Sequence, residues 1–150
     1  MGLGDVPVEN GERLARMILD EKHLKRANDF VTPKAEAFLP YKHVELSVIR
    51  HRGFMEGELW EVGRDVSAKR EASDQFGRKF PLLGRGDFLA RDARTQNLDV
   101  IPVEGPELPR NHADVIGWPK DKPAQMLCAL KIAAASVFVA APSVTELAAG

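Results

Sequence analysis

The segment 121–141 constrains the fold most strongly, because it is the most apolar stretch of the chain. Asp121 is placed to cap a helix, and Pro123 suits the first turn of that helix. Two apolar stripes follow, one made of Met126, Leu130, Ala133 and Val137 and the other of Leu127, Ala134 and Phe138. A helix that is apolar on every side lies at the centre of a fold or is partly covered by a partner. We therefore expect a central C-terminal helix.

The same helix is too polar to cross a membrane. Gln125, Lys131 and Ser136 interrupt it, and much of the remainder is alanine. A lysine near the middle costs about 2.5–3.5 kcal/mol on insertion scales, and alanine offsets little of this cost. The first eight residues lack the basic start and apolar run of a signal peptide. The sequence therefore predicts a soluble, cytoplasmic protein with no membrane partner.

Size and composition predict one domain over 1–150, with flexible ends near 1–8 and 142–150. A chain of 150 residues has the usual length of a domain and can bury about 70% of its unfolded surface. Its 21 basic and 22 acidic residues give a net charge of −1, which excludes attraction of the whole molecule to polyanions. The single cysteine, Cys128, excludes an intramolecular disulfide and a cysteine-based metal cluster.

The remaining periodicity predicts an α+β fold. Helical spacing of apolar residues indicates two further helices, over 8–30 and 55–71, and 87–96 resembles a short helix capped by Asp87. Strands are expected at 44–50, 80–83, 98–103 and 113–118. The expected architecture is a small sheet of three or four strands, packed against the C-terminal helix and two further helices.

The candidate catalytic residue is His112, which follows a proline-rich loop at the start of an expected strand. The ordinary pKa of histidine lies near neutral pH, so His112 is suited to general acid–base catalysis. Arg110 is suited to binding a phosphate or carboxylate, and Asp114 and Trp118 complete the candidate ligand site. The alternative is that these residues end a strand, with His112 bonded to a backbone carbonyl.

Three other arginines are candidate ligand-binding residues. Arg50 and Arg52 end the expected strand at 44–50 on one face, and an anion site would form if they met His112 across the sheet. Arg85 lies between two glycines whose amides are suited to an anion-binding nest. The alternative is that the end of the strand at 44–50 is simply exposed to solvent.

The segment from Arg78 to Arg94 carries five basic residues against two aspartates, so a contact with nucleic acid is a further hypothesis. Phosphate-loop and dinucleotide-binding motifs are absent from the sequence. The histidines at 23, 43, 51 and 112 are scattered, so we expect neither a metal nor a cofactor.

Four segments resemble small bacterial proteins that have no assigned role. They are Thr-Pro-Lys-Ala-Glu-Ala-Phe-Leu-Pro (32–40), Leu-Ser-Val-Ile-Arg (46–50), Glu-Leu-Trp-Glu-Val-Gly (58–63) and Asn-His-Ala-Asp-Val-Ile-Gly-Trp-Pro (111–119). The resemblance spans most of the chain and implies neither an activity nor site residues.

Two functions follow as expectations. The first is a non-enzymatic partner-binding or accessory protein, which would bind another protein or a second copy of itself through an apolar helix face. The alternative is an enzyme or binder that acts on a nucleotide or another phosphate-containing ligand through Arg50, Arg85, Arg110 and His112. A shared concave pocket for these four residues would favour the alternative.

Overall fold

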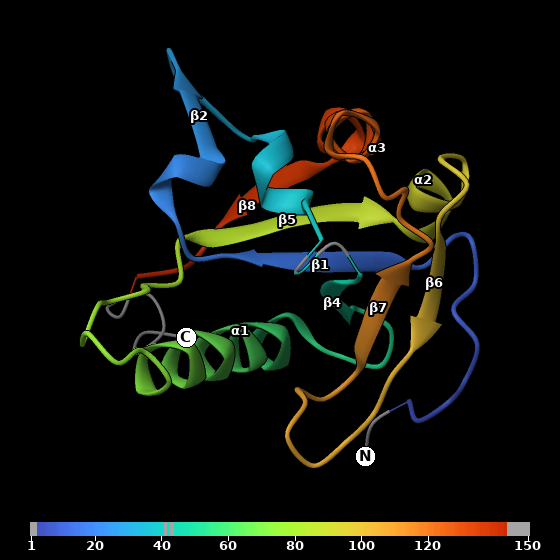
Figure 1. The fold of residues 1–150 in the computed structure, drawn as a ribbon. Coiled ribbons are helices and arrows are strands. Elements are labelled where there is room, and N and C mark those ends of the chain that lie inside the picture. Colours follow the sequence, from blue (N-terminus) through green and yellow to red (C-terminus); the bar gives the residue numbers. More distant parts are fainter. Residues whose placement is uncertain (1–2, 41, 43, 144–150) are drawn as a thin grey trace.

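A computed structural model describes residues 3–40, 42 and 44–143 and has an α+β fold. An antiparallel six-stranded sheet has the order β6-β7-β4-β1-β5-β8, and β2 and β3 form a separate hairpin (Figure 1). The sheet strands are β1 (Arg13–Ile18), β4 (Leu46–Arg50), β5 (Gly84–Leu89), β6 (Asp99–Pro102), β7 (His112–Ile116) and β8 (Val137–Ala140). The other elements are β2 (Leu24–Ala27), β3 (Phe30–Pro33), α1 (Glu56–Ala72), α2 (Ala90–Arg94), α3 (Lys122–Ala135) and the 3-10 turns η1 (Glu21–His23) and η2 (Ala35–Phe38).

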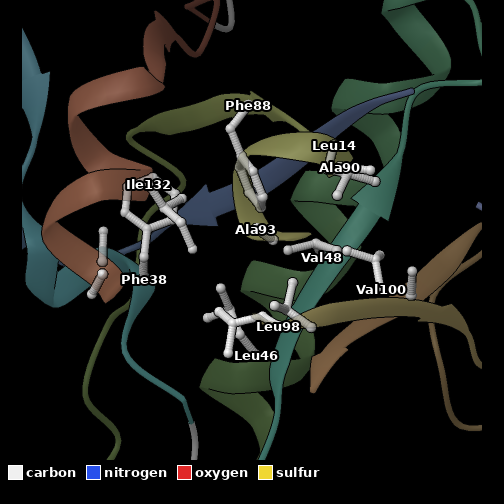
Figure 2. Packing of buried hydrophobic residues seen from close by; sticks show 14 of the residues in the cluster. Leu14, Phe38, Leu46, Val48, Phe88, Ala90, Ala93, Leu98, Val100 and Ile132 are labelled. Atoms are coloured by element: carbon white, nitrogen blue, oxygen red, sulfur yellow. The ribbon is translucent and has the colours of Figure 1, made fainter. Parts of the chain in front are cut away.

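The sheet is covered on both faces. The helix α1 lies along one face, while α3, η2 and the β2–β3 hairpin lie on the other (Figure 1). We call these the α1 face and the α3 face. Buried side chains on the α3 face form the larger cluster (Figure 2), in which the rings of Phe38 and Phe88 meet edge to face at 5.6 Å. The smaller cluster on the α1 face consists of Ala15, Met17, Ile49, Leu59 and Val62.

The helix expected over 8–30 is wrong, because this segment forms β1, η1, β2 and the start of β3. Leu14, Met17 and Ile18 do recur at helical spacing, but β1 is a central strand with both faces covered. Residues of such a strand are buried on both sides and read as a continuous apolar run rather than as an alternation. That run is compatible with either a helix or a strand.

The strand expected at 80–83 is also wrong, since β5 begins at Gly84. A Cβ at Gly84 would lie 2.4 Å from the carbonyl oxygen of Val139, and one at Gly86 would lie 2.8 Å from the Phe38 ring. These glycines allow β8 and η2 to approach β5 closely, and their presence in a strand interior is typical of such an approach. Asp87 lies within β5 and caps no helix. The short helix α2 begins only after Leu89.

The sheet therefore has six strands rather than three or four. The strands expected at 44–50, 98–103 and 113–118 correspond to β4, β6 and β7, and the helix expected at 55–71 corresponds to α1. The strands β1, β5 and β8 were not predicted, because their residues were assigned to helices or to a glycine-rich connection.

The last helix begins as expected but ends earlier and faces differently. The carboxylate of Asp121 accepts a hydrogen bond from the amide of Ala124 at 2.9 Å. The helix ends at Ala135, after which Val137 and Phe138 belong to β8. Its fully buried positions are Gln125, Ala129 and Ile132. The expected inward stripe through Leu130 is wrong, because small Ala129 rather than a leucine is in the buried contact with the core.

The described part of the chain contains no helix that is long and apolar enough to span a membrane. Of the ends expected to be flexible, residues 1–2 and 144–150 lie outside the described residues. Within the described part of the N-terminal end, the amide of Leu3 donates to the side chain of Asn111, and Val8 is buried.

Candidate functional site

Arg50 and Glu12 form a buried ion pair at the end of β4. The Nε of Arg50 donates to Glu12 Oε1 at 2.8 Å, and Nη2 donates to Oε2 at 2.7 Å. The same guanidinium donates to the carbonyls of Val6 and Pro7. Burial alone raises the pKa of Glu12, but the bonds from Arg50 and from the Glu9 amide outweigh it and the pKa is lowered. This ion pair ties the N-terminal segment to the sheet.

A second polar cluster joins β4 and β7 on the α1 face and contains His112. The ring Nδ1 lies 3.1 Å from the carbonyl oxygen of Val103. Since a carbonyl only accepts, Nδ1 carries the proton in the neutral ring, and Nε2 accepts the hydroxyl of Ser47 at 2.5 Å. His112 and Asp114 are buried, whereas Ser47 is exposed. An imidazole that accepts a hydrogen bond from an exposed hydroxyl has the arrangement of a base beside a nucleophile.

The electrostatics of this second cluster are unusual because two carboxylates lie close together. Burial raises the pKa of Asp114 to about 6, and the charge and hydrogen bond of Glu45 add to this effect. Burial lowers the pKa of His112, although its bond to Val103 and the charge of Glu45 act in the opposite direction. His112 is therefore neutral near pH 7. Asp114 Oδ1 lies 3.4 Å from Nε2, not beside Nδ1, so this is not a Ser-His-Asp triad.

A third cluster on the α1 face was not predicted. Arg85 Nε donates to Asp87 Oδ1 at 3.0 Å, and Nη1 donates to Glu56 Oε1 at 2.6 Å. His51 Nε2 lies 2.9 Å from Asp87 Oδ1, and the guanidinium of Arg85 lies 4.5 Å from the Trp60 ring centroid. Alternation along β5 would have placed Arg85 and Asp87 on one face. This alternation was not used, because Asp87 was expected to cap a helix.

The residues proposed from the sequence fall into separate groups: His112 lies beside Asp114, and Arg50 and Arg52 both lie near Glu12. Arg50 is buried on the α3 face, and half-exposed Arg52 lies 3.6 Å from Glu12. The guanidinium of Arg110 lies 5.2 Å from the Phe54 ring centroid, and Trp118 Nε1 donates to the carbonyl of Val115. Arg50, Arg85, Arg110 and His112, the four residues of the expected phosphate site, have different contact partners. The hollow of about 280 Å³ between α1 and Ala141–Pro142 contains none of them.

The basic segment from Arg78 to Arg94 is largely neutralised. Arg78 pairs with Asp74 at 2.8 Å, and Arg94 pairs with Asp99 at 3.0 Å. The amides of Gly84, Arg85 and Gly86 lie in a paired strand, so they form no anion nest. Nothing in this segment presents an unmatched row of cations.

Exposed apolar side chains lie instead along one side of α3. Leu127 is 60% exposed and Leu130 is 49% exposed. Leu127, Leu130 and Ala134 recur at spacings of three and four residues, so they share the outward side of α3. This surface is the second candidate site.

The described residues include no group of three or more histidine, cysteine, aspartate or glutamate side chains suited to a metal ion. His43 lies outside the described residues. Comparison of the chain with protein-family models, with curated proteins and with solved structures finds no match.

Proposed function

We propose that the chain is a non-enzymatic partner-binding or accessory protein that uses the outward face of α3. The observation that carries this proposal is the exposure of Leu127 and Leu130 on a helix of the folded core. The charged residues of α3 are Lys122 and Lys131. Exposed apolar surface on a folded domain is typical of an interaction site when its members are contiguous.

The energetic argument favours a partner over solvent. Complete burial of a leucine contributes about 1.5–3 kcal/mol, and these two leucines keep about half of their surface in water. Covering them would contribute on the order of 2 kcal/mol, a factor of about 30 in affinity. Of the candidate arginines, Arg50 and Arg85 offer no comparable gain to a ligand, because both are buried and bonded to carboxylates.

A charged double variant tests this proposal. In Leu127→Glu/Leu130→Glu, both changes lie on the surface, so folding is retained while partner binding weakens by at least about tenfold. The matched control is Phe76→Glu, which alters a side chain of similar exposure, 73%, outside α3. Proteins captured by the wild type and by the control, but not by the double variant, are then purified, and their affinity is measured by calorimetry. Equal binding by all three proteins would contradict the proposal.

A second candidate is an enzyme or binder that acts on a nucleotide or another phosphate-containing ligand, with His112 as the acid–base group. It is supported by the contact between the exposed hydroxyl of Ser47 and the neutral imidazole of His112. Titration of the wild type with nucleoside triphosphates and pyrophosphate tests it directly. Binding that is lost in His112→Gln at unchanged melting temperature would support this candidate, and absence of binding would remove it.

A further inference from the structure

The two outer edges of the six-stranded sheet differ in their backbone groups. At the β6 edge, the amide of Val103 donates to the carbonyl of His112. Pairing alternates along an antiparallel strand, so Ile101 and Asp99 also face β7, whereas Val100 and Pro102 face outward. The Val100 amide donates to the Asp99 carboxylate at 2.7 Å, and its carbonyl accepts from Arg94 at 3.2 Å.

Pro102 completes the protection of this edge, because proline has no amide hydrogen to offer. Charged side chains and proline on an outer strand are typical of edges that are closed to further pairing. At β6, the outward amides are therefore either bonded within the chain or absent.

The β8 edge has no proline and no charged side chain, although strand β3 of the hairpin packs against β8. The amide of Ala141 donates to the carbonyl of Leu83, and the same alternation turns Val139 and Val137 toward β5. The amides and carbonyls of Phe138 and Ala140 point outward, and the described part of the chain supplies no hydrogen-bond partner for them. The strand contains no proline and no charge. Uncapped apolar edges of this kind are ready templates for strand addition.

We infer that β8 pairs antiparallel with β8 of a second copy of this chain across a two-fold axis. This inference goes beyond the proposed function, because it concerns the edge of the sheet rather than the outward face of α3. Since only Phe138 and Ala140 present outward groups, one register satisfies them all: Phe138 lies opposite Ala140 of the second copy, and Val139 lies opposite its counterpart on the axis. Four backbone hydrogen bonds form, and the two sheets become continuous.

The absence of charge favours a second copy of this chain over a charged strand. In a two-fold contact each residue near the axis meets its own kind, so any charge there would be repelled by its counterpart. The segment 137–142 is Val-Phe-Val-Ala-Ala-Pro and carries no charge. A charged strand would meet no complementary charge in this segment.

A proline substitution at position 140 tests the inference with little damage to the fold. The amide of Ala140 points away from β5, and its side chain is exposed, so Ala140→Pro removes an outward donor while keeping the pairing of β8 with β5. The substitution removes an outward amide hydrogen from β8, just as Pro102 leaves β6 without one. Ala140→Ser keeps the amide and is the matched control. In sedimentation equilibrium, we expect dimers for the wild type and Ala140→Ser, and at least about tenfold weaker association for Ala140→Pro.

Charge substitutions on the axis give an independent test if Ala140→Pro fails to fold. Val139→Lys alone and Val139→Glu alone should each be monomeric, because like charges then face each other. An equimolar mixture of the two should regain the mass of a dimer. Hydrogen exchange adds a direct readout, since the amides of Phe138 and Ala140 should be protected in the wild type in proportion to the dimer fraction.

Three outcomes would overturn the inference. They are a monomeric wild type at all concentrations, a dimer that survives in Ala140→Pro, and a mixture of the Val139 variants that stays monomeric. The proposed function is judged separately through Leu127→Glu/Leu130→Glu. A dimer that is lost in this double variant but kept in Ala140→Pro would support binding through α3 and refute pairing through β8.

Discussion

The Glu12–Arg50 pair and the Ser47–His112–Asp114 cluster lie at opposite faces of β4 and bury charge in different ways. In the pair, one cation meets one anion through two hydrogen bonds, and two carbonyls use further donors. In the cluster, Asp114 is buried beside the negative charge of Glu45, and its pKa is raised as a result. The Glu12–Arg50 pair therefore stabilises the fold, whereas the carboxyl group of Asp114 titrates near neutral pH.

The largest effect is expected at the pair. Arg50→Ala should lower the free energy of unfolding by about 3–5 kcal/mol, because it leaves the Glu12 carboxylate buried without its cation. Arg52→Ala is the control. Its side chain is half exposed and 3.6 Å from Glu12, so its loss should cost less than about 1 kcal/mol. Urea denaturation of both variants measures the difference. Similar losses of unfolding free energy would contradict the prediction that the buried Arg50 stabilises the fold more than the exposed Arg52.

A smaller loss of stability is expected at His112. His112→Ala leaves the carbonyl of Val103 without its donor in a buried position, which costs about 1–3 kcal/mol. Thermal and urea unfolding should both report this loss. A variant that unfolds like the wild type but has lost a defined ligand would reverse the assignment and favour the enzymatic candidate.

Asp114→Asn should change how stability depends on pH. The pKa of Asp114 is raised in the folded protein from 3.8 to about 6. The stability that its protonated form contributes is therefore fully present below pH 3.8 and is lost as the pH rises through about 6. The loss is about 3 kcal/mol, and it should be absent in the variant. Urea denaturation between these pH values measures it. Parallel curves for the two proteins would show that Asp114 titrates normally.

The smallest effect is expected at the exposed end of the cluster. Ser47→Ala removes the hydroxyl that donates to His112 Nε2, but solvent reaches this position and can replace the bond. The free energy of unfolding should fall by less than about 1 kcal/mol, as measured in urea. A loss as large as that of Arg50→Ala would show that the hydroxyl of Ser47 is as shielded from solvent as the Glu12–Arg50 pair.

Local patterns predicted α1 and the strands β4, β6 and β7, but not the strands β1, β5 and β8. The boundaries of α1 and the cap at Asp121 follow from signals within a few residues. The central position of β1 depends on β4 and β5, which are distant in the sequence, so Leu14, Met17 and Ile18 were compatible with a helix. Leu130 was misplaced for a related reason, since the space beneath α3 is set by η2 and admits the small side chain of Ala129.

The candidate site was predictable only in part. The bond between His112 and a backbone carbonyl was one of two interpretations that the sequence allowed, and the contact with Val103 is present. The contact with Ser47 depends on the register of β4 and β7, in which Ile49 lies opposite His112. No spacing in the sequence encodes that register. His51, Asp87 and Arg85 meet across β1 for the same reason.

The protection of β6 has a consequence for the size of any assembly. A sheet with two open edges can add copies at both ends without limit, which is how fibrils grow. Here the groups of Val100 are occupied and Pro102 has no amide hydrogen, so a chain that pairs through β8 presents only a closed edge to the next arrival. In a dimer paired through β8, growth would therefore stop after one addition, because Asp99, Arg94 and Pro102 close the remaining edge of each sheet.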